Sequence, residues 1–508
     1  MHAIKRGYIV LIGTLAICKA IRKHTRVKSE SDNMLDKLEK CVELGNKMGA
    51  EFVEARFDDL ILRTLQRVND VWRDIILRSR IGFGVVCFYG GASGYSFTPS
   101  DDGKELENTV SRAVKMAKAS AQVASLKLDF DRRPPVESHE FDTFPVKTHP
   151  QNEDLRYKTD LVNRAIDAAR EYGKNISNVA GMYGELYGRK LFTNSEGSAI
   201  DWNFEVIDLQ CRVTSKTPSG GLVNGTGSAG GTMGLELFHT KGSTPEDIGK
   251  EAGSHAKEQL KAKAPPAGRF RALIENELAG VLAHESFGHL SEGDFVVNGG
   301  SPLTGKIGTR LGTDQATIVD CGTPKISEFG GLWVPYDDQG TRSSETTILD
   351  KGILKRYLHS RGTAHYLEQE PTGNCRAVHF GFMPIPRMTN TYFTQGELTK
   401  EEALELLDTG AYAIQASGGQ VDDDGSFLFK ATRGYWVQNG RIKEPIREVS
   451  LSGNILNLLS KVEGATKDLR ILAGYFGGCG KNGQFQLPCG LGGPELVIGE
   501  VAVGGKAN

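Results

Sequence analysis

The sequence predicts an α+β protein in which antiparallel sheets carry helices packed on one face, arranged as two lobes. Three observations support this prediction. Amphipathic helical patterns are separated by stretches that alternate between apolar and polar residues, as strands do. Glycine is abundant, 62 of 508 residues, and many glycines stand in pairs, which favours numerous turns and strands. The length allows two or three domains with sizeable cores.

The composition is that of an ordinary globular protein, with 39% hydrophobic residues, 24% charged residues and a formal net charge of −2. This balance gives no electrostatic reason to expect nucleic acid or a membrane as a partner. The cysteines have no paired spacing, which argues against a disulfide framework and for a reducing, cytoplasmic location.

Residues 1–33 are predicted to be a disordered extension or a wrongly assigned start. They contain an apolar run, GYIVLIGTLAIC, flanked by basic residues. A signal anchor is the alternative, although this run is short for a membrane span. The folded protein is expected to begin at Met34, because Ser31, Asp32 and Asn33 are capping candidates before an amphipathic helix.

Residues 34–264 are predicted to form an N-terminal α+β domain. Its expected elements are a helix at 34–48, a strand at 51–57, a hairpin at 80–97, a helix at 106–121, a proline-bearing crossing at 134–150, a helix at 152–172, strands within 179–215 that turn at 194–197, and a helix at 244–263.

Residues 265–508 are predicted to form a C-terminal β-rich domain that begins at Pro265 and Pro266. Two helices interrupt its strands, at 275–288 and 399–409. The first of these helices carries the candidate metal site, so this domain is where function is expected.

The candidate site lies in the stretch VLAHESFGHLSEGD, in which His284, Glu285 and His289 are spaced H-E-x-x-x-H. The familiar zinc-peptidase helix is one residue shorter, H-E-x-x-H. On a regular helix, positions i and i+4 lie about 40° apart, whereas i and i+5 lie about 140° apart and cannot share one ion. A local distortion is therefore required: either the turn widens into a π-bulge, or the helix stops at Gly288 and His289 swings back.

A catalytic zinc commonly has three protein ligands and one open position, so a third ligand is needed. Cys479, in GYFGGCGKNGQ, is the candidate because its flanking glycines would let the thiolate approach closely. Glu285 would then stand beside the ligand His284 and act as general base toward a water nucleophile at the open position, the chemistry of peptide-bond hydrolysis. Without the metal, the same residues describe a hydrogen-bonded His-Glu pair and a small buried cysteine.

These segments resemble the TldD/PmbA family, and specifically its TldD-type zinc metallopeptidase subunit. The resemblance rests on six stretches of the sequence: HESFGHLSEGD, GGCGKNGQ, DDQGT, PRMTNTYF, GGQVDDDGSFLF and TNSEG. It implies a Zn²⁺-dependent peptidase of small or unfolded peptides, with ligands His284, His289 and Cys479. It also implies a homodimer, or a heterodimer with a PmbA-like subunit that lacks the metal-binding residues.

Four further residues are predicted to bind substrate. Arg387 and Asn390 could hold substrate carbonyl groups, although Arg387 could equally pair with a carboxylate in the sheet. Gly418 and Gly419 would allow a substrate peptide to lie as an added strand against an exposed sheet edge.

Polar residues near the candidate ligands have more than one interpretation. Where the family commonly has D-D-E-G-T, this chain has Gln339, which puts any role of that glutamate in doubt. Asp337 and Asp338 are candidates for partners of the histidines, with turn formation as the alternative. Glu292 and Asp294 are candidates for shaping the site or capping the distorted helix.

Two other functions compete with the peptidase. One is a non-catalytic peptide-binding subunit in which zinc only joins the lobes; the other is a metal-dependent amidase or esterase. Glu285 argues against the first, because a structural zinc usually has four protein ligands and needs no base.

Overall fold

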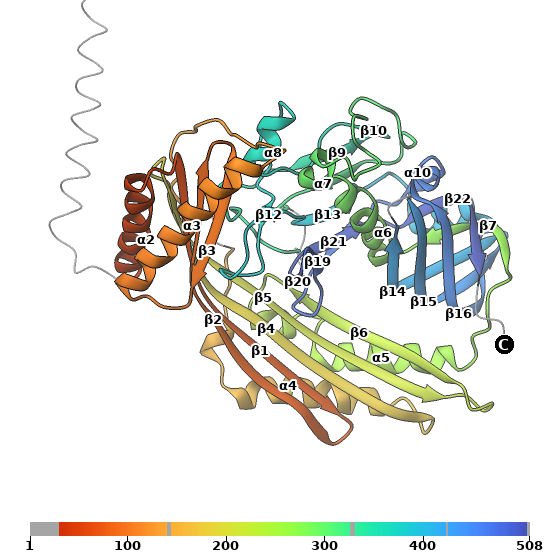
Figure 1. Ribbon diagram of the computed structural model, residues 1–508. Coiled ribbons are helices and arrows are strands. Elements are labelled where there is room, and N and C mark those ends of the chain that lie inside the picture. Colours follow the sequence, from red (N-terminus) through yellow and green to blue (C-terminus); the bar gives the residue numbers. More distant parts are fainter. Residues whose placement is uncertain (1–29, 140–143, 326–330, 423–424, 505–508) are drawn as a thin grey trace, which may run out of the picture.

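The computed structural model describes residues 30–139, 144–325, 331–422 and 425–504, and it confirms the predicted α+β class (Figure 1). The described residues form three six-stranded sheets and two two-stranded sheets. Strand pairs are antiparallel except β7–β14 and β13–β21. Of the predicted extension, residues 1–29 lie outside the described residues. None of the described helices combines the length and apolar character needed to cross a membrane.

The first part of the chain builds one sheet in the order β3-β2-β1-β4-β5-β6. Its elements are α2 (Glu30–Lys47), β1 (Phe52–Val68), β2 (Val71–Tyr89), β3 (Ala92–Thr98), α3 (Gly103–Val123), η2 (Pro150–Asn152), α4 (Leu155–Arg170), β4 (Ile176–Asn194), β5 (Ala199–Lys216), β6 (Leu222–Gly231), η3 (Leu235–His239) and α5 (Pro245–Gln259). Each helix and strand predicted for this part is present. The structure differs in that α2 starts before Met34 and that residues 58–79 continue β1 and begin β2.

Strand β1 explains how this sheet is covered on both faces. Val53 and Phe57 pack with α2 and α3, and Leu65 packs with α4 and α5, so the odd-numbered residues face helices. The even-numbered residues Glu54 and Arg56 are 3% and 4% exposed, because the second part of the chain covers that face. The alternation predicted a half-buried strand, yet here the polar face is buried too.

The second part of the chain builds the remaining sheets, in the orders β10-β9-β8-β13-β21-β18 and β16-β15-β14-β7-β22-β17. Its elements are β7 (Gly268–Ile274), α6 (Asn276–Ala283), η4 (His284–Gly288), α7 (Gly293–Val297), β8 (Ile318–Asp320), β9 (Thr346–Asp350), β10 (Ile353–Leu354), α8 (Arg361–Tyr366), β11 (Cys375–Arg376), β12 (Ile385–Pro386), β13 (Asn390–Phe393), α9 (Lys400–Leu407), β14 (Gly410–Val421), β15 (Ser426–Gln438), β16 (Arg441–Asn454), α10 (Ile455–Leu459), β17 (Val462–Ala465), β18 (Arg470–Leu472), β19 (Cys479–Lys481), β20 (Gln484–Leu487), β21 (Gly490–Gly493) and β22 (Leu496–Gly504).

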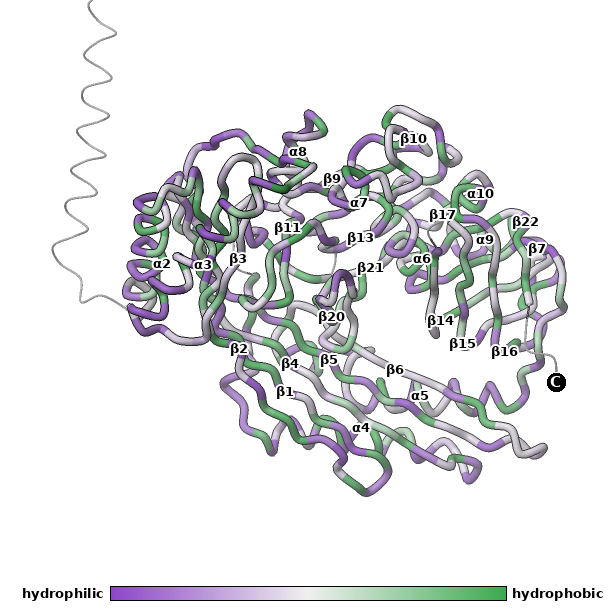
Figure 2. Tube along the Cα trace, in the orientation of Figure 1, coloured by the Kyte–Doolittle hydropathy of each residue, from purple (hydrophilic) through white to green (hydrophobic). Residues whose placement is uncertain are grey.

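The largest hydrophobic core lies in this second part, and α6 runs through it. Leu278, Leu282 and Phe287 are almost fully buried there, between the strands of the two large sheets. By contrast, the outer helix α2 shows alternating hydrophilic and hydrophobic bands, as expected for a helix that buries one side only (Figure 2). The core therefore fixes the position of the helix that leads into His284.

Candidate metal centre

The helix that carries the two histidines changes its winding at the first of them. Helix α6 ends at Ala283, and the next five residues, His284–Gly288, form a π turn. His289 follows with ordinary helical angles, φ −63° and ψ −42°. The structure thus adopts the first of the two predicted distortions, a widened turn, and the helix does not stop at Gly288.

Gly288 serves a different purpose from the predicted one. Its φ is not in the positive range, and a Cβ atom placed on it would lie 2.1 Å from Sδ of Met388. A side chain at this position would therefore clash with Met388, which lies beside the π turn. The glycine permits close packing around the distorted turn.

Cys479 reaches the histidines from the hairpin formed by β19 and β20 (Figure 1). Gly478, just before it, has a φ of 149°, and its Cβ would lie 2.9 Å from the carbonyl oxygen of Leu487. Sγ of Cys479 lies 3.1 Å from Nε2 of His289. One ligand atom from each of His284, His289 and Cys479 lies within 4.8 Å of the others, and these three form the metal-ligand group found among the described residues.

The side chains of this cluster shift one another's pKa values. Burial raises the pKa of the Cys479 thiol, but hydrogen bonds with both histidines outweigh burial and lower it below its usual value. Burial lowers the pKa of His284, but the sulfur atoms of Cys489 and Cys479 outweigh burial and raise it. Burial also lowers the pKa of His289, while contacts with Cys479 and Glu292 raise it more strongly. The cluster therefore favours a thiolate, the form of cysteine that binds metals.

The contact between Glu292 and His289 is a feature of this site that the sequence does not predict. The carboxylate of Glu292 is 1% exposed and lies 3.1 Å from Nδ1 of His289, on the opposite side of the ring from Cys479. Burial raises its pKa, but His289 and Lys481 outweigh burial and lower it, so Glu292 is a carboxylate. A carboxylate behind a histidine fixes the orientation of the ring and strengthens it as a ligand.

Two cations balance this carboxylate. Nζ of Lys481 lies 3.0 Å from Glu292 and 2.6 Å from Asp294, and Nε of Arg387 lies 3.9 Å from Glu292. Arg387 is fully buried, and its guanidinium nitrogens have no hydrogen-bond partner among the described residues. Arg387 thus pairs with a carboxylate, but Glu292 precedes α7 and is not part of a sheet strand, as the alternative from the sequence supposed.

Glu285 occupies the π turn beside His284 and is partly exposed. Its carboxylate makes no hydrogen bond or ion pair with any residue that the structure describes. The carboxylate of the predicted general base is thus available to accept a hydrogen bond from a water molecule.

The three ligand residues fit a zinc ion. Zinc accepts cysteine and histidine ligands at about 2.0–2.3 Å in tetrahedral geometry, and the observed spacing of the three ligand atoms suits a single ion between them. A set of two histidines and one cysteine leaves the fourth position open, which is the pattern of catalytic sites.

The other predicted polar residues lie elsewhere. The Asn390 amide is buried and bonded to the backbone of Cys321 and Leu332. Asp337 accepts three backbone N–H groups, which is the predicted turn role. Asp338 contacts Arg56 and Lys190, so neither aspartate is a partner of the histidines.

Gly418 and Gly419 are exposed residues of β14. Strand β7 pairs with β14 only along 410–413, so beyond that stretch β14 has β15 on one side and, among the described residues, no strand on the other. A Cβ on Gly419 would lie 3.0 Å from Val281 on α6, which places this free edge beside the helix of the metal centre.

Comparison with known proteins supports this interpretation. Models described as PmbA/TldA metallopeptidase domain 1, central domain and C-terminal domain match residues 77–117, 148–260 and 267–505. A metalloprotease of Methanothermobacter thermautotrophicus is 36% identical over 428 residues, covering 84% of this chain and 89% of the relative. A zinc metalloprotease TldD homolog of Saccharolobus solfataricus is 36% identical over 247 residues, covering 49% and 54%.

Solved structures share the fold. TldE from Thermococcus kodakarensis superposes with a TM-score of 0.72 at 15% identity, covering 92% of this chain and all of that one. A proposed modulator of a DNA gyrase from Thermotoga maritima superposes with a TM-score of 0.74 at 22% identity, with the same coverage.

Fold, site and relatives together define a metallopeptidase. The chain belongs to the PmbA/TldD metallopeptidase family.

Proposed function

We propose that this metallopeptidase is zinc-dependent and hydrolyses peptide bonds in small or unfolded peptides, with His284, His289 and Cys479 as ligands and Glu285 as general base. The observation that supports it most directly is the convergence of the three ligand atoms within 4.8 Å. Beside them stands Glu285, whose carboxylate has no partner among the described residues. A structural zinc would not need that glutamate, so the non-catalytic alternative has less support.

Different residues of the chain would have different roles in the reaction. When bound, zinc polarises a carbonyl group and lowers the pKa of a water molecule to about 7. Glu285 accepts the proton of the attacking water and passes it to the departing amine nitrogen. Glu292 keeps the His289 ring in place, and Lys481 helps to keep Glu292 ionised.

A substrate would add to the free edge of β14 near Gly418 and Gly419 as an extended strand. This edge lies beside α6, so a chain bound there would run past the metal centre. Only a peptide with no hydrogen-bonded structure of its own can pair in this way, which accounts for small or unfolded substrates.

Assembly and location follow by analogy. The relatives include TldD homologs, and TldE shares the fold, so we expect a homodimer or a heterodimer with a related PmbA-like subunit. All seven cysteines in the described part of the chain are free and buried, which suits a reducing cytoplasm.

The test is the substitution Glu285→Gln. We expect the purified variant to bind zinc as the wild type does, and kcat for peptide cleavage to fall about 100-fold or more, because a general base is lost while the ligands remain. Metal analysis and peptide-cleavage kinetics measure the two quantities. Unchanged cleavage would rule out Glu285 as the base.

Cys479→Ser provides the complementary variant. It should lose both zinc and cleavage, because the thiolate ligand is gone. The matched control is Cys211→Ser, which alters a buried thiol in the core beneath α4 and α5 and should retain both.

A further inference from the structure

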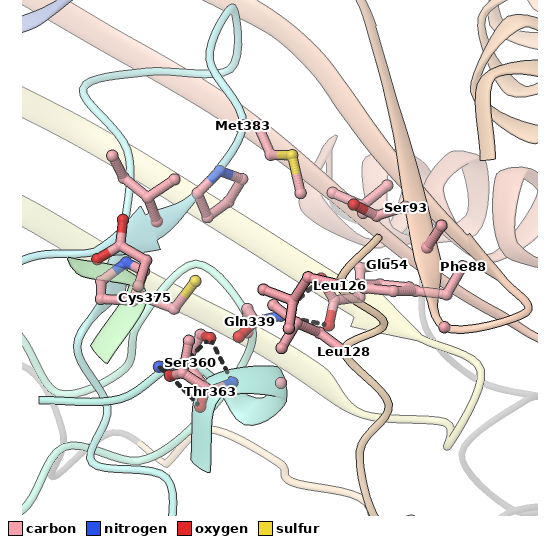
Figure 3. Close-up of a pocket in the computed structure, with 18 of the residues that line it drawn as sticks. Glu54, Phe88, Ser93, Leu126, Leu128, Gln339, Ser360, Thr363, Cys375 and Met383 are labelled. Atoms are coloured by element: carbon pink, nitrogen blue, oxygen red, sulfur yellow. Dashed lines mark hydrogen bonds between the residues drawn. The ribbon is translucent and has the colours of Figure 1, made fainter. Parts of the chain in front are cut away.

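A cavity of about 340 Å³ lies where the first sheet meets the second part of the chain (Figure 3). Most of its wall is apolar and comes from both parts: Val86, Phe88, Leu126, Leu128, Met383 and Ile385. Its volume is within the range of small-ligand sites, about 300–1,000 Å³. An apolar wall with few polar groups suits a hydrocarbon chain.

One wall of this cavity carries a carboxyl group with no cation bound to it. Glu54 is 3% exposed, and its side chain accepts hydrogen bonds from Nε2 of Gln339 at 3.2 and 3.4 Å (Figure 3). Glu54 forms no ion pair with any described residue. The nearby Arg361 is committed to Glu196, at 2.6 and 3.0 Å.

The carboxyl group of Glu54 is also difficult to ionise in this setting. Burial raises the pKa of Glu54 to about 8, with Asp337 and Glu196 adding to the rise and Arg361 and Gln339 opposing it. A buried carboxylate is costly unless a positive charge accompanies it. A cation entering the cavity would restore that missing partner.

The cavity adjoins the metal centre. Asp294 and Pro386 both line it, and Nζ of Lys481 contacts Asp294 at 2.6 Å and the carbonyl oxygen of Pro386 at 3.3 Å. The same Nζ lies 3.0 Å from Glu292, the partner of His289. Lys481 and Glu292 therefore connect the wall of the cavity to His289.

We propose that this cavity is a specificity subsite for a basic substrate residue, whose hydrocarbon stem lies along the apolar wall and whose cationic end pairs with Glu54. The ligand class is a lysine or arginine side chain of a peptide. This inference rests on the proposed peptidase function, which supplies the peptide, and adds a preference that the metal centre alone does not give.

The test uses acetylated, amidated hexapeptides in which a single lysine, or norleucine as its neutral counterpart, is moved through each position. Acetylation removes the terminal ammonium group, so the side chain carries the only positive charge. At one position we expect kcat/KM for lysine to exceed that for norleucine about tenfold or more. Glu54→Gln should bring this ratio close to one.

The matched control is Glu205→Gln, which removes a buried carboxylate of the same sheet outside the cavity, paired with His149. This variant should keep the lysine preference. A second variant covers the case in which Glu54→Gln folds poorly: Leu128→Trp fills the cavity from its partly exposed wall and should reduce the preference as well.

A binding measurement separates this inference from the proposed function. In a Glu285→Gln background, fluorescence anisotropy should show tighter binding of the lysine peptide, and Glu54→Gln should abolish the difference. If peptides are cleaved but no lysine preference depends on Glu54, the subsite is refuted and the peptidase stands. If nothing is cleaved while the Glu54-dependent binding preference persists, the subsite stands and the peptidase is refuted.

Discussion

Glu292 links His289, the proposed metal ligand, to the cations Lys481 and Arg387. Glu292 and Arg387 are buried, whereas His289 and Lys481 are partly exposed. The substitution Glu292→Gln should lower zinc affinity about 10- to 100-fold, because the ring loses the carboxylate that orients it. Competition with a chelator measures this change. Glu463→Gln, which removes a carboxylate paired with Arg271 on β7, is the control and should bind zinc as the wild type does.

Glu54 gives a prediction about pH and stability. Its pKa is about 8 in the folded protein against 4.5 ordinarily, so between these values the folded state retains a proton that the unfolded state has released. The contribution of Glu54 to stability therefore falls as pH rises through this window. The difference in Tm between Glu54→Gln and wild type should increase from pH 5 to pH 8 and then level off; a constant difference would contradict the shifted pKa.

Single residues also show what a sequence can and cannot reveal about a site. From the sequence, His284, Glu285 and His289 are candidates because their types and spacing are local, and Cys479 is a candidate because of its glycine-rich setting. The contact of Glu292 with His289 depends on the π turn, and the contact of Gln339 with Glu54 joins residues 285 positions apart. A contact between residues so far apart in the sequence leaves no local pattern.

Among the elements, the π turn was predicted only as one of two solutions. Gly288, at the end of this turn, packs against Met388. We expect Gly288→Ala to destabilise the protein by about 1–3 kcal/mol through overpacking. The double variant Gly288→Ala/Met388→Ala should be less destabilised than the sum of the two single variants, because the shortened side chain leaves room for the new methyl group. Thermal unfolding of all four proteins tests this; additive effects would exclude the contact as the cause.

Helices were easier to predict than long strands. The helices expected at 399–409 and 244–263 appear as α9 and α5 with small differences at their ends. Strand β1 was predicted over 51–57 but continues to Val68. Beyond Phe57 its polar residues meet partners distant in the sequence, as when Arg63 lies 3.5 Å from Glu185, so the local pattern ends before the strand does.

At the scale of the whole molecule, the two parts of the chain are joined by buried charges. Asp338 accepts a hydrogen bond from Nζ of Lys190 at 2.6 Å and forms an ion pair with Arg56 at 3.4 Å, and all three side chains are buried or nearly so. Asp338→Ala should reduce the free energy of unfolding by about 3–5 kcal/mol, because Arg56 and Lys190 lose the carboxylate that they share in a buried setting. Denaturant unfolding measures this loss.

The control for that experiment is Asp350→Ala, which breaks an exposed pair with Lys355 at 3.7 Å. It should cost no more than about 1 kcal/mol. Equal losses for the two variants would show that the buried contact has no special part in joining the two halves of the chain.

The thiol of Cys479 meets His289 across 190 positions of sequence, and it comes from the last tenth of the chain. During synthesis on the ribosome, the histidine-bearing helix emerges long before the sulfur does. With the proposed ligand set, a growing chain lacks the sulfur ligand until residue 479 has emerged. We expect no peptidase activity from it before that point.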